Sequence, residues 1–210
     1  DELPYDSLIV ATGARTGYVG KNEWADRAPG LKSIEDALEI RRRILTTFEA
    51  AEQEQDPVRR TAMMTFIVVG GGPTGVELAG TLAEITRHTL RSGFRRCQPS
   101  DARILLLDAA PRVLGTFPED LAADARRKLE GIHVEVRTHT KVVNVDDRSV
   151  TLQTGEQTEV IATDTVLWAA GVEASPLGRI LAEAAGCETA RGGRVAVGPE
   201  LHLVSHPDVY

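Results

Sequence analysis

Apolar residues along the chain follow three spacings, and each spacing predicts a different kind of element. Uninterrupted apolar runs predict buried strands, and apolar residues at every third or fourth position predict helices with one buried face. Alternating apolar and polar residues predict strands with one exposed face. The runs and the helical spacings predict strands at 8–11, 65–69, 103–109, 133–136 and 165–171, and helices at 33–51, 75–90 and 118–131.

The order of these elements indicates the fold class. From residue 65 to residue 136 strands and helices alternate, which is typical of parallel strands joined by right-handed crossovers. Residues 141–161 then alternate apolar and polar positions around two polar turns, which predicts a meander of antiparallel strands. The expected fold is therefore α/β, with a parallel sheet plus a three-stranded antiparallel meander.

Composition and charge exclude several classes of function. With 210 residues, 42% of them hydrophobic, the chain can bury a substantial core. Its net charge of -7 gives no general attraction for phosphate backbones, so we expect no nucleic-acid partner. No apolar run approaches the roughly 18 residues that cross a bilayer, and no signal peptide opens the chain. Because the chain lacks an initiating Met, we expect it to be a piece of a longer protein.

Disulfide and metal chemistry have little support in the sequence. Cys97 and Cys187 lie far apart without a C-x-x-C pair, which disfavours both a disulfide framework and a zinc site. His202 and His206 lie in an extended segment that contains Pro207, so the helical spacing of a metal site is missing. We therefore expect no metal ion.

The clearest chemical signal is the motif G-x-G-x-x-G between a predicted strand and a predicted helix. Gly70 allows the sharp turn, Gly72 permits close approach of a ligand to the backbone, and Gly75 lets helix and strand pack tightly. The free N–H groups and the positive end of the helix stabilise a pyrophosphate there. The motif predicts a dinucleotide-binding loop, and a turn with only a packing role is the alternative. The loop and the first helical turn comprise Gly70, Gly71, Gly72, Pro73, Thr74, Gly75, Val76 and Glu77.

An acid at the end of the next strand completes this type of site. Asp108, followed by Ala109, occupies that place and is predicted to accept hydrogen bonds from the adenosine ribose. Its distance from the glycines exceeds the usual offset of about 20 residues, because an insertion between His88 and Asp101 lengthens the crossover. A carboxylate would repel a 2′-phosphate and so favours NAD over NADP, whereas Arg112 argues weakly the other way. The alternative is a strand-terminal acid that only faces water.

Glu77 admits two interpretations from the sequence. Thr74 to Glu77 matches a capping box, in which the Glu side chain reaches back to an amide at the start of the helix. A carboxylate next to a bound pyrophosphate also suffers like-charge repulsion, which points to a role near the nicotinamide. The residues alone leave both interpretations open.

Several segments together resemble the type II (non-proton-pumping) NADH:quinone dehydrogenases. The segments are LIVATGA, EWADRAPGLKSIEDALEIRRRIL, VVGGGPTGVELAG, HTLRSGFRRCQPSDARILLLDAAPRVL and VLWAAGVEASPLG, and the resemblance covers essentially the whole chain. The insertion with Phe94, Arg95 and Arg96 and the run from Trp168 to Val172 are its most specific parts. Members of this family are membrane-associated flavoproteins with an FAD domain, a nested NADH domain and a C-terminal membrane-binding segment.

The resemblance implies a domain arrangement and a set of site residues. Residues 31–171 would be a Rossmann-like NADH-binding domain, flanked by remnants of an FAD-binding domain at 1–30 and 172–210. Glu77 would be the catalytic residue, near nicotinamide and flavin. The other implied contacts are Ala11, Thr12 and Gly13 near FAD, Gly70 to Glu77 at the pyrophosphate, Asp108 and Ala109 at the ribose, and Ala170, Gly171 and Val172 beside the nicotinamide.

The implied activity is hydride transfer from NADH to FAD and onward to a membrane quinone. The full-length protein would be cytoplasmic, peripheral on the inner face of the cell membrane, and a homodimer. The chain alone is expected to bind NADH without turning it over. Two alternatives stay open: a soluble FAD-dependent NADH reductase of a ferredoxin, rubredoxin or disulfide, and a non-enzymatic NADH-sensing module.

Overall fold

The computed structural model describes residues 3–90, 93–190 and 192–210, and the chain folds as two compact units. The large unit comprises residues 18–171, and the small unit comprises residues 1–17 and 172–210. Residues 18–30 precede the start at residue 31 that the sequence predicts for the NADH domain, but they lie in the large unit. The reason is packing, since Trp24 and Ala28 are buried there and the Trp168 N–H donates to the Pro29 carbonyl at 2.9 Å.

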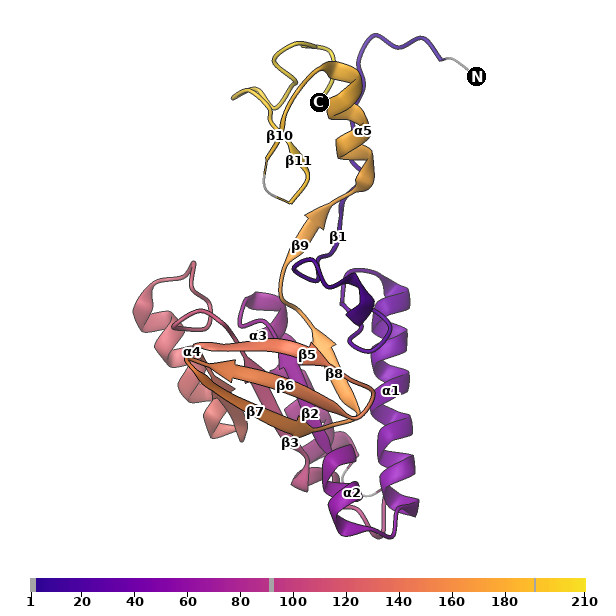
Figure 1. Cartoon of the computed structure of the whole chain (residues 1–210), viewed down its shortest axis with the longest axis vertical. Coiled ribbons are helices and arrows are strands. Elements are labelled where there is room, and N and C mark those ends of the chain that lie inside the picture. Colours follow the sequence, from indigo (N-terminus) through magenta and orange to yellow (C-terminus); the bar gives the residue numbers. More distant parts are fainter. Residues whose placement is uncertain (1–2, 91–92, 191) are drawn as a thin grey trace. The chain divides into compact units, whose positions relative to one another are not determined.

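A parallel sheet forms the centre of the large unit (Figure 1). Its strands are β2 (Thr65–Val69), β3 (Arg103–Leu107), β4 (Val134–Arg137) and β8 (Thr165–Trp168), in the order β4-β3-β2-β8. All three pairings are parallel. All the apolar runs predicted as buried strands except residues 8–11 therefore form the sheet, and the predicted α/β fold class is confirmed.

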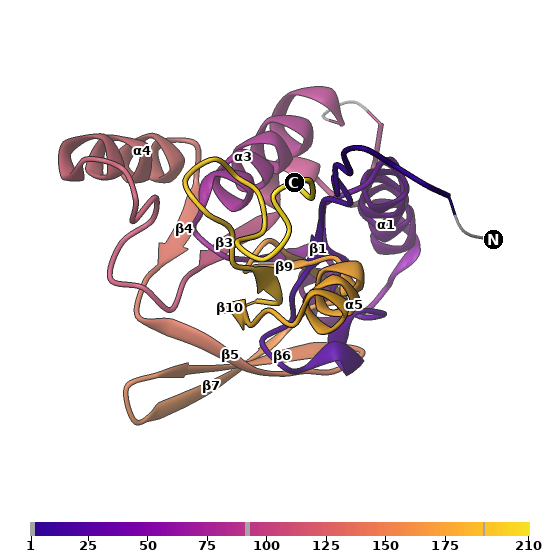
Figure 2. The same ribbon diagram turned by 90° about the horizontal axis from the view of Figure 1, so that it is seen from above.

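Helices cover one face of this sheet and an antiparallel meander covers the other, as seen from above in Figure 2. The main helices are α1 (Ile34–Gln53), α3 (Pro73–Glu84) and α4 (Glu119–Gly131), and α3 continues into a π-helical turn at Ile85–Thr89. The meander consists of β5 (Thr140–Val145), β6 (Ser149–Thr154) and β7 (Gln157–Ala162) in that order, with a β-bulge between Val142 and Asn144. Two short 3-10 turns lie at Asn22–Trp24 and Pro99–Asp101.

Successive residues of the central strands enter two different cores. Phe66 and Val68 pack with the helices, whereas Ile67 and Val69 pack with the meander. Because both faces are covered, these strands carry continuous apolar runs rather than alternating ones. This double burial is the physical reason for the pattern from which the strands were predicted.

Two helices show what local sequence does and does not reveal. At the start of α1 the Ser33 side chain accepts from the Asp36 N–H and Asp36 accepts from the Ser33 N–H, a complete capping box. The seven-residue helix α2 (Pro57–Met63), capped by Asp56, was not predicted because it is short and begins within the charged stretch of residues 49–60. The pattern thus finds the long helix and misses the short one.

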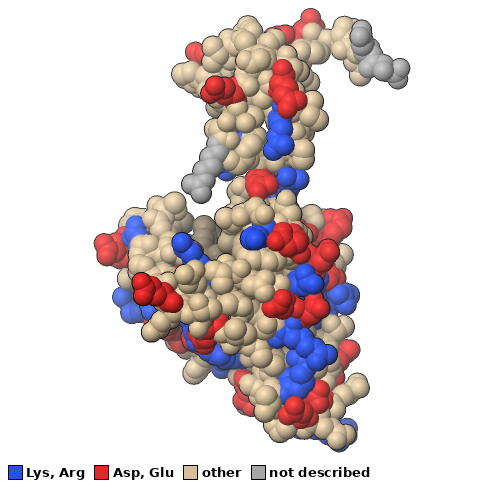
Figure 3. Space-filling view, viewed as in Figure 1, with Lys and Arg blue, Asp and Glu red and all other residues tan. Residues whose placement is uncertain are grey.

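Charged side chains of both signs are interspersed on the visible face of the large unit (Figure 3). On α1, for example, Glu39 pairs with both Arg42 and Arg43 at 2.7 and 2.6 Å. Acids and bases one turn apart on a helix neutralise each other in this way.

The small unit contains a two-stranded ribbon, a helix and a short hairpin. β1 (Ala14–Thr16) pairs antiparallel with β9 (Val172–Ala174), α5 (Pro176–Ala185) follows, and β10 (Thr189–Ala190) pairs with β11 (Arg194–Val195). The prediction of a buried strand at 8–11 is wrong for this chain, because Ile9 is 76% exposed. The segment makes an isolated parallel bridge between Leu8 and Val209, and the Val10 N–H donates to the Tyr210 carbonyl at 2.7 Å. This short pairing leaves its apolar side chains largely uncovered.

Candidate functional site

The glycine turn after β2 is built so that two of its glycines contact backbone and one faces open space. Gly70 has φ +110°, and its N–H donates to the Leu107 carbonyl at 2.7 Å. A Cβ on Gly75 would lie 1.7 Å from the Gly70 carbonyl oxygen, whereas a Cβ on Gly72 would meet nothing within 4 Å. Gly70 and Gly75 thus shape the turn, and Gly72 leaves its backbone accessible to a ligand.

Helix α3 begins earlier than the sequence pattern predicts. Its N-cap is Gly72 and Pro73 is its first residue, so Thr74 lies inside the first turn and cannot cap the helix. Of the two interpretations of Glu77, the capping box with Thr74 is therefore wrong. Glu77 is exposed, with no hydrogen bond to the helix start among the described residues. Within the described part of the chain, no side chain accepts a hydrogen bond from the first N–H groups of α3, which suits them to binding an anion.

Asp108 faces the glycine turn, as the fingerprint requires. One oxygen of its half-buried carboxylate accepts from the Gly71 N–H, and the other accepts from the Ala110 N–H at 2.6 Å. The carboxylate therefore joins the loop after β2 to the loop after β3. Arg112, the residue that argued for a 2′-phosphate, donates instead to the Gly115 carbonyl at 2.9 Å.

A cavity of about 700 Å³ opens in the large unit at the carboxyl ends of β2, β3 and β8. Its volume lies within the ~300–1,000 Å³ range of small-molecule and cofactor sites, and its position is where ligands bind in open α/β sheets. Residues predicted from sequence supply much of its lining, namely Gly70, Gly72, Asp108, Ala109, Ala170 and Gly171.

The other predicted residues do not line this cavity. Gly71 donates its N–H to Asp108, and Gly75 is buried against Gly70. The rest of the loop points elsewhere, with Thr74 and Val76 half-buried and Pro73 and Glu77 exposed. The predicted residues that belong to the small unit are Ala11, Thr12, Gly13 and Val172.

Two walls of the cavity were not predicted. One comes from the segment after residue 17 and contains Val19, Lys21 and Trp24. The other is the edge strand β5, of which four consecutive residues, 140–143, line the cavity. A regular strand turns only alternate residues to one side, and the β-bulge at this point makes the continuous wall. No local sequence signal marks either wall.

Aromatic side chains form the floor beneath the cavity. The rings of Tyr18 and Trp24 each lie 5.5 Å from that of Trp168, centroid to centroid, and all three side chains are buried. The Trp168 indole N–H donates to the Ala170 carbonyl at 2.7 Å, and burial raises the pKa of the Tyr18 phenol. These rings act as rigid packing that fixes the end of β8.

The insertion before β3 is held to α1 by one carboxylate. The backbone N–H groups of Arg95, Arg96 and Cys97 all donate to Glu52, at 3.0, 2.8 and 2.9 Å. Led by the Cys97 N–H, these bonds lower the pKa of the Glu52 carboxyl to about 2. Burial raises the pKa of the Cys97 thiol to about 11, so this thiol stays neutral and unreactive near neutral pH.

Replacement of Glu52 by Gln is expected to destabilise the chain at neutral pH, because the neutral amide is a weaker acceptor for three N–H groups. The folded pKa of Glu52 lies below its ordinary value of 4.5, so the stabilisation is present above that pH and is lost as the pH falls towards 2. Urea unfolding of wild type and Glu52→Gln between pH 7 and pH 2 should give midpoints that converge at the acidic end. Glu49→Gln, at an exposed position of the same helix, is the control. A midpoint difference that stays constant with pH would contradict this role.

Among the described residues, no group of three or more His, Cys, Asp and Glu side chains is arranged to hold a metal ion. No helix in the part of the chain that the structure describes is both long and apolar enough to span a membrane.

The family model for pyridine nucleotide-disulphide oxidoreductases matches residues 1–210. The chain is 47% identical over 210 residues to the type II NADH:quinone oxidoreductase Ndh of Mycobacterium tuberculosis, covering 100% of this chain and 45% of that protein. It is 48% identical over 209 residues to NdhA of the same organism, covering 99% of this chain and 44% of that protein. The chain thus spans less than half the length of these relatives.

Solved structures show the same fold. The structure of NDH2 from Plasmodium falciparum in complex with NADH superposes with a TM-score of 0.82 at 22% identity, covering 99% of this chain and 43% of that one. A NAD-dependent persulfide reductase from A. fulgidus gives a TM-score of 0.67 at 23% identity, covering 100% and 33%. Likeness at this level of identity concerns the fold alone.

Proposed function

Because the chain belongs to the pyridine nucleotide-disulphide oxidoreductase family, we propose that it is the NADH-binding part of a type II NADH:quinone oxidoreductase. The observation that carries the proposal is the cavity, in which the glycine turn and the strand-end carboxylate of Asp108 come together. Identity of 47% to Ndh, which extends along the whole chain, supports the choice of acceptor class. The full-length activity, its quinone, its homodimeric state and its peripheral place on the cytoplasmic face of the membrane belong to the same proposal.

The cavity offers a distinct contact for each part of NADH. The diphosphate would lie against the Gly70–Gly72 backbone and the start of α3, where a Cβ at residue 72 would find open space. The Asp108 carboxylate keeps lone pairs for the ribose hydroxyls besides those used by Gly71 and Ala110. The nicotinamide would lie beside Ala170 and Gly171, which leaves Ala109 and the β5 wall for the adenosine.

The flavin would need more than this chain provides. In the small unit Thr12 and Gly13 line a cavity of about 230 Å³, smaller than the ~300–1,000 Å³ of cofactor sites, so Ala11 to Gly13 and Val172 would contribute only part of a flavin site. Bound FAD would supply the hydride-accepting chemistry. The residues of this chain would hold and orient the dinucleotide, using the remote adenosine and diphosphate contacts to place the nicotinamide.

Binding by the chain itself is the direct test. Titration calorimetry with NADH, NADPH and ADP-ribose should show NADH and ADP-ribose bound and NADPH bound more weakly. A folded chain that binds none of them would refute the proposal. In the full-length protein, a yellow chromophore bleached by NADH and reoxidised by a quinone supports it. Reoxidation only by a ferredoxin, rubredoxin or disulfide would favour a soluble reductase, and a colourless NADH-binding protein would favour a sensor.

Glu77 keeps its proposed catalytic role, now without a capping role to compete with it. Its exposed carboxylate lies in the first turns of α3, after the diphosphate loop. In the full-length enzyme, Glu77→Gln is expected to slow flavin reduction by NADH about tenfold or to shift its pH dependence, with the melting temperature unchanged. Stopped-flow absorbance at several pH values measures this. Wild-type reduction rates at every pH would remove Glu77 from the mechanism.

A further inference from the structure

The turn that forms one rim of the cavity has an unfavourable residue at its tip. The Lys21 N–H donates to the Tyr18 carbonyl at 2.9 Å, and the two central residues, Val19 and Gly20, have φ of +53° and +83°. Two positive φ values with this hydrogen bond define a type I′ turn, whose first central position favours Asn, Asp or Gly. A β-branched residue at positive φ is a genuine outlier. Val19 is therefore strained.

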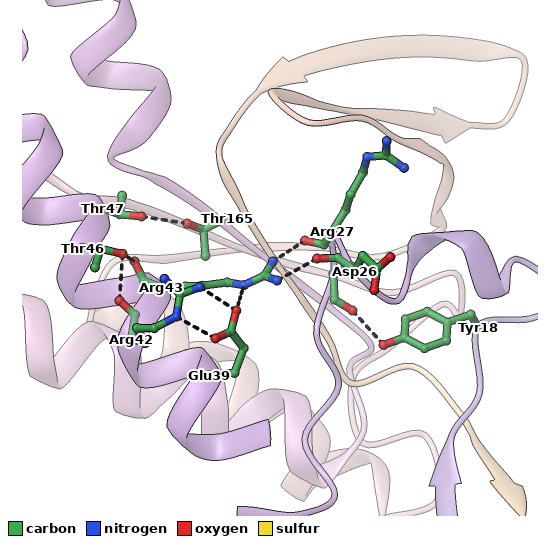
Figure 4. A network of polar contacts seen from close by, with 10 residues as sticks. Tyr18, Asp26, Arg27, Glu39, Arg42, Arg43, Thr46, Thr47 and Thr165 are labelled. Carbon is green, nitrogen blue, oxygen red and sulfur yellow. Dashed lines mark hydrogen bonds and ion pairs between the residues drawn. The ribbon is translucent and has the colours of Figure 1, made fainter. Parts of the chain in front are cut away.

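Packing on both sides of the turn imposes this conformation. The Tyr18 ring packs on Trp168, and its hydroxyl donates to the Ala28 carbonyl at 2.9 Å. Figure 4 shows Arg43 of α1 reaching the backbone of the segment that follows, where it donates to the Asp26 and Arg27 carbonyls at 2.7 and 2.9 Å. Strain held by its surroundings in this way is characteristic of functional sites.

The strain is not compensated by burial of the Val19 side chain. Val19 is 80% exposed, yet it lines the cavity together with Lys21 and Trp24. Asn or Gly at position 19 would relieve the backbone strain without losing buried apolar surface. The Val19 side chain therefore does not stabilise the folded state. Because Val19 also lines the cavity, a bound ligand is the contact that could compensate for this strain.

We propose that Val19 is a cofactor-contact residue that covers the nicotinamide ring of NADH. The assignment to this end of the cavity follows from the floor, because Tyr18 and Trp24 pack on Trp168, the residue that directly precedes Ala169–Gly171. The residues proposed to contact the adenosine, Asp108 and those of β5, line the cavity from other elements. The inference rests on the proposed function, and it adds an apolar lid contact that the glycine motif does not supply.

The test uses Val19→Asn and Val19→Gly, which relieve the strain and remove the apolar side chain. Each variant is expected to raise the melting temperature by about 2–4 °C while weakening NADH about tenfold by titration calorimetry. The affinity for ADP-ribose, which lacks the nicotinamide, should not change. The matched control is His133→Asn, because His133 also has positive φ, +65°, and is exposed but does not line the cavity. His133→Asn should raise the melting temperature and leave the affinity for NADH unchanged.

Different results would contradict the role of Val19 and the proposed function of the chain. Wild type that binds NADH, with both variants binding it equally well, overturns the role of Val19 and leaves the proposed function intact. Equal losses for NADH and ADP-ribose overturn the assignment to the nicotinamide. A wild-type chain that binds neither ligand overturns the proposed function and this inference with it.

Discussion

Replacement of Gly75 by Ala is expected to abolish stable folding of the large unit. The added Cβ would lie 1.7 Å from the Gly70 carbonyl oxygen and 2.9 Å from its carbon. The Gly70 backbone cannot move away, because its N–H is bonded to the Leu107 carbonyl and the Ala169 backbone packs closely against it. A Cβ built on Gly70 would lie 2.7 Å from the Ala169 backbone. A backbone clash of this kind costs on the order of 3 kcal/mol or more, a large part of the ~5–15 kcal/mol that stabilises a domain. Circular dichroism and urea unfolding measure the loss.

Gly72→Ala is the matched control for this substitution. Its backbone has φ −73° and ψ 179°, which Ala adopts readily, and its Cβ would meet no atom within 4 Å. We expect a stability loss of about 1 kcal/mol or less, from the poorer N-cap, together with a loss of NADH affinity greater than tenfold. The methyl group would occupy the space proposed for the diphosphate. A stable Gly75→Ala protein, or a Gly72→Ala protein with wild-type affinity, would contradict this division of roles.

Asp108→Ala is expected to weaken NADH binding by about 10- to 100-fold and to reduce the preference for NADH over NADPH. Hydrogen bonds to a charged group contribute ~1.5–3 kcal/mol, which sets this range. NADPH should lose less, because the variant also removes the repulsion between the carboxylate and a 2′-phosphate. Titration calorimetry with both dinucleotides gives the ratio of affinities. An unchanged ratio would exclude Asp108 from the ribose site.

Asp108 has a structural role besides the ligand role proposed for it. Its carboxylate bridges the N–H groups of Gly71 and Ala110, so the Ala variant also loosens two loops and should unfold at a lower temperature. Asp108→Asn keeps the shape and one acceptor oxygen but removes the charge. We expect it to lose selectivity with a smaller loss of melting temperature. Equal selectivity in wild type and Asp108→Asn would mean that the charge does not discriminate between the cofactors.

The sequence predicted those elements whose burial or backbone geometry restricts the residue types that can form them. The strands β2 and β3 are covered on both faces, so their apolar runs are continuous and their existence could be predicted. The roles of Gly70 and Gly75 in the turn could also be predicted, because a turn this tight has no space for a side chain at either position. The same reasoning predicted a strand at 8–11, and this prediction is wrong. An apolar run predicts burial, but Ile9 is exposed in this chain.

The tertiary structure decided how the site is closed. The sequence by itself indicated the α/β fold class, the glycine turn after β2 and the acid at the end of β3, because strand, helix and turn signals each depend on neighbours within a few residues. The Val19 rim and the bulged wall of β5 were decided only by packing. These features bring together segments that are far apart in the sequence. The spacing of neighbouring residues does not indicate which distant segment will pack against them.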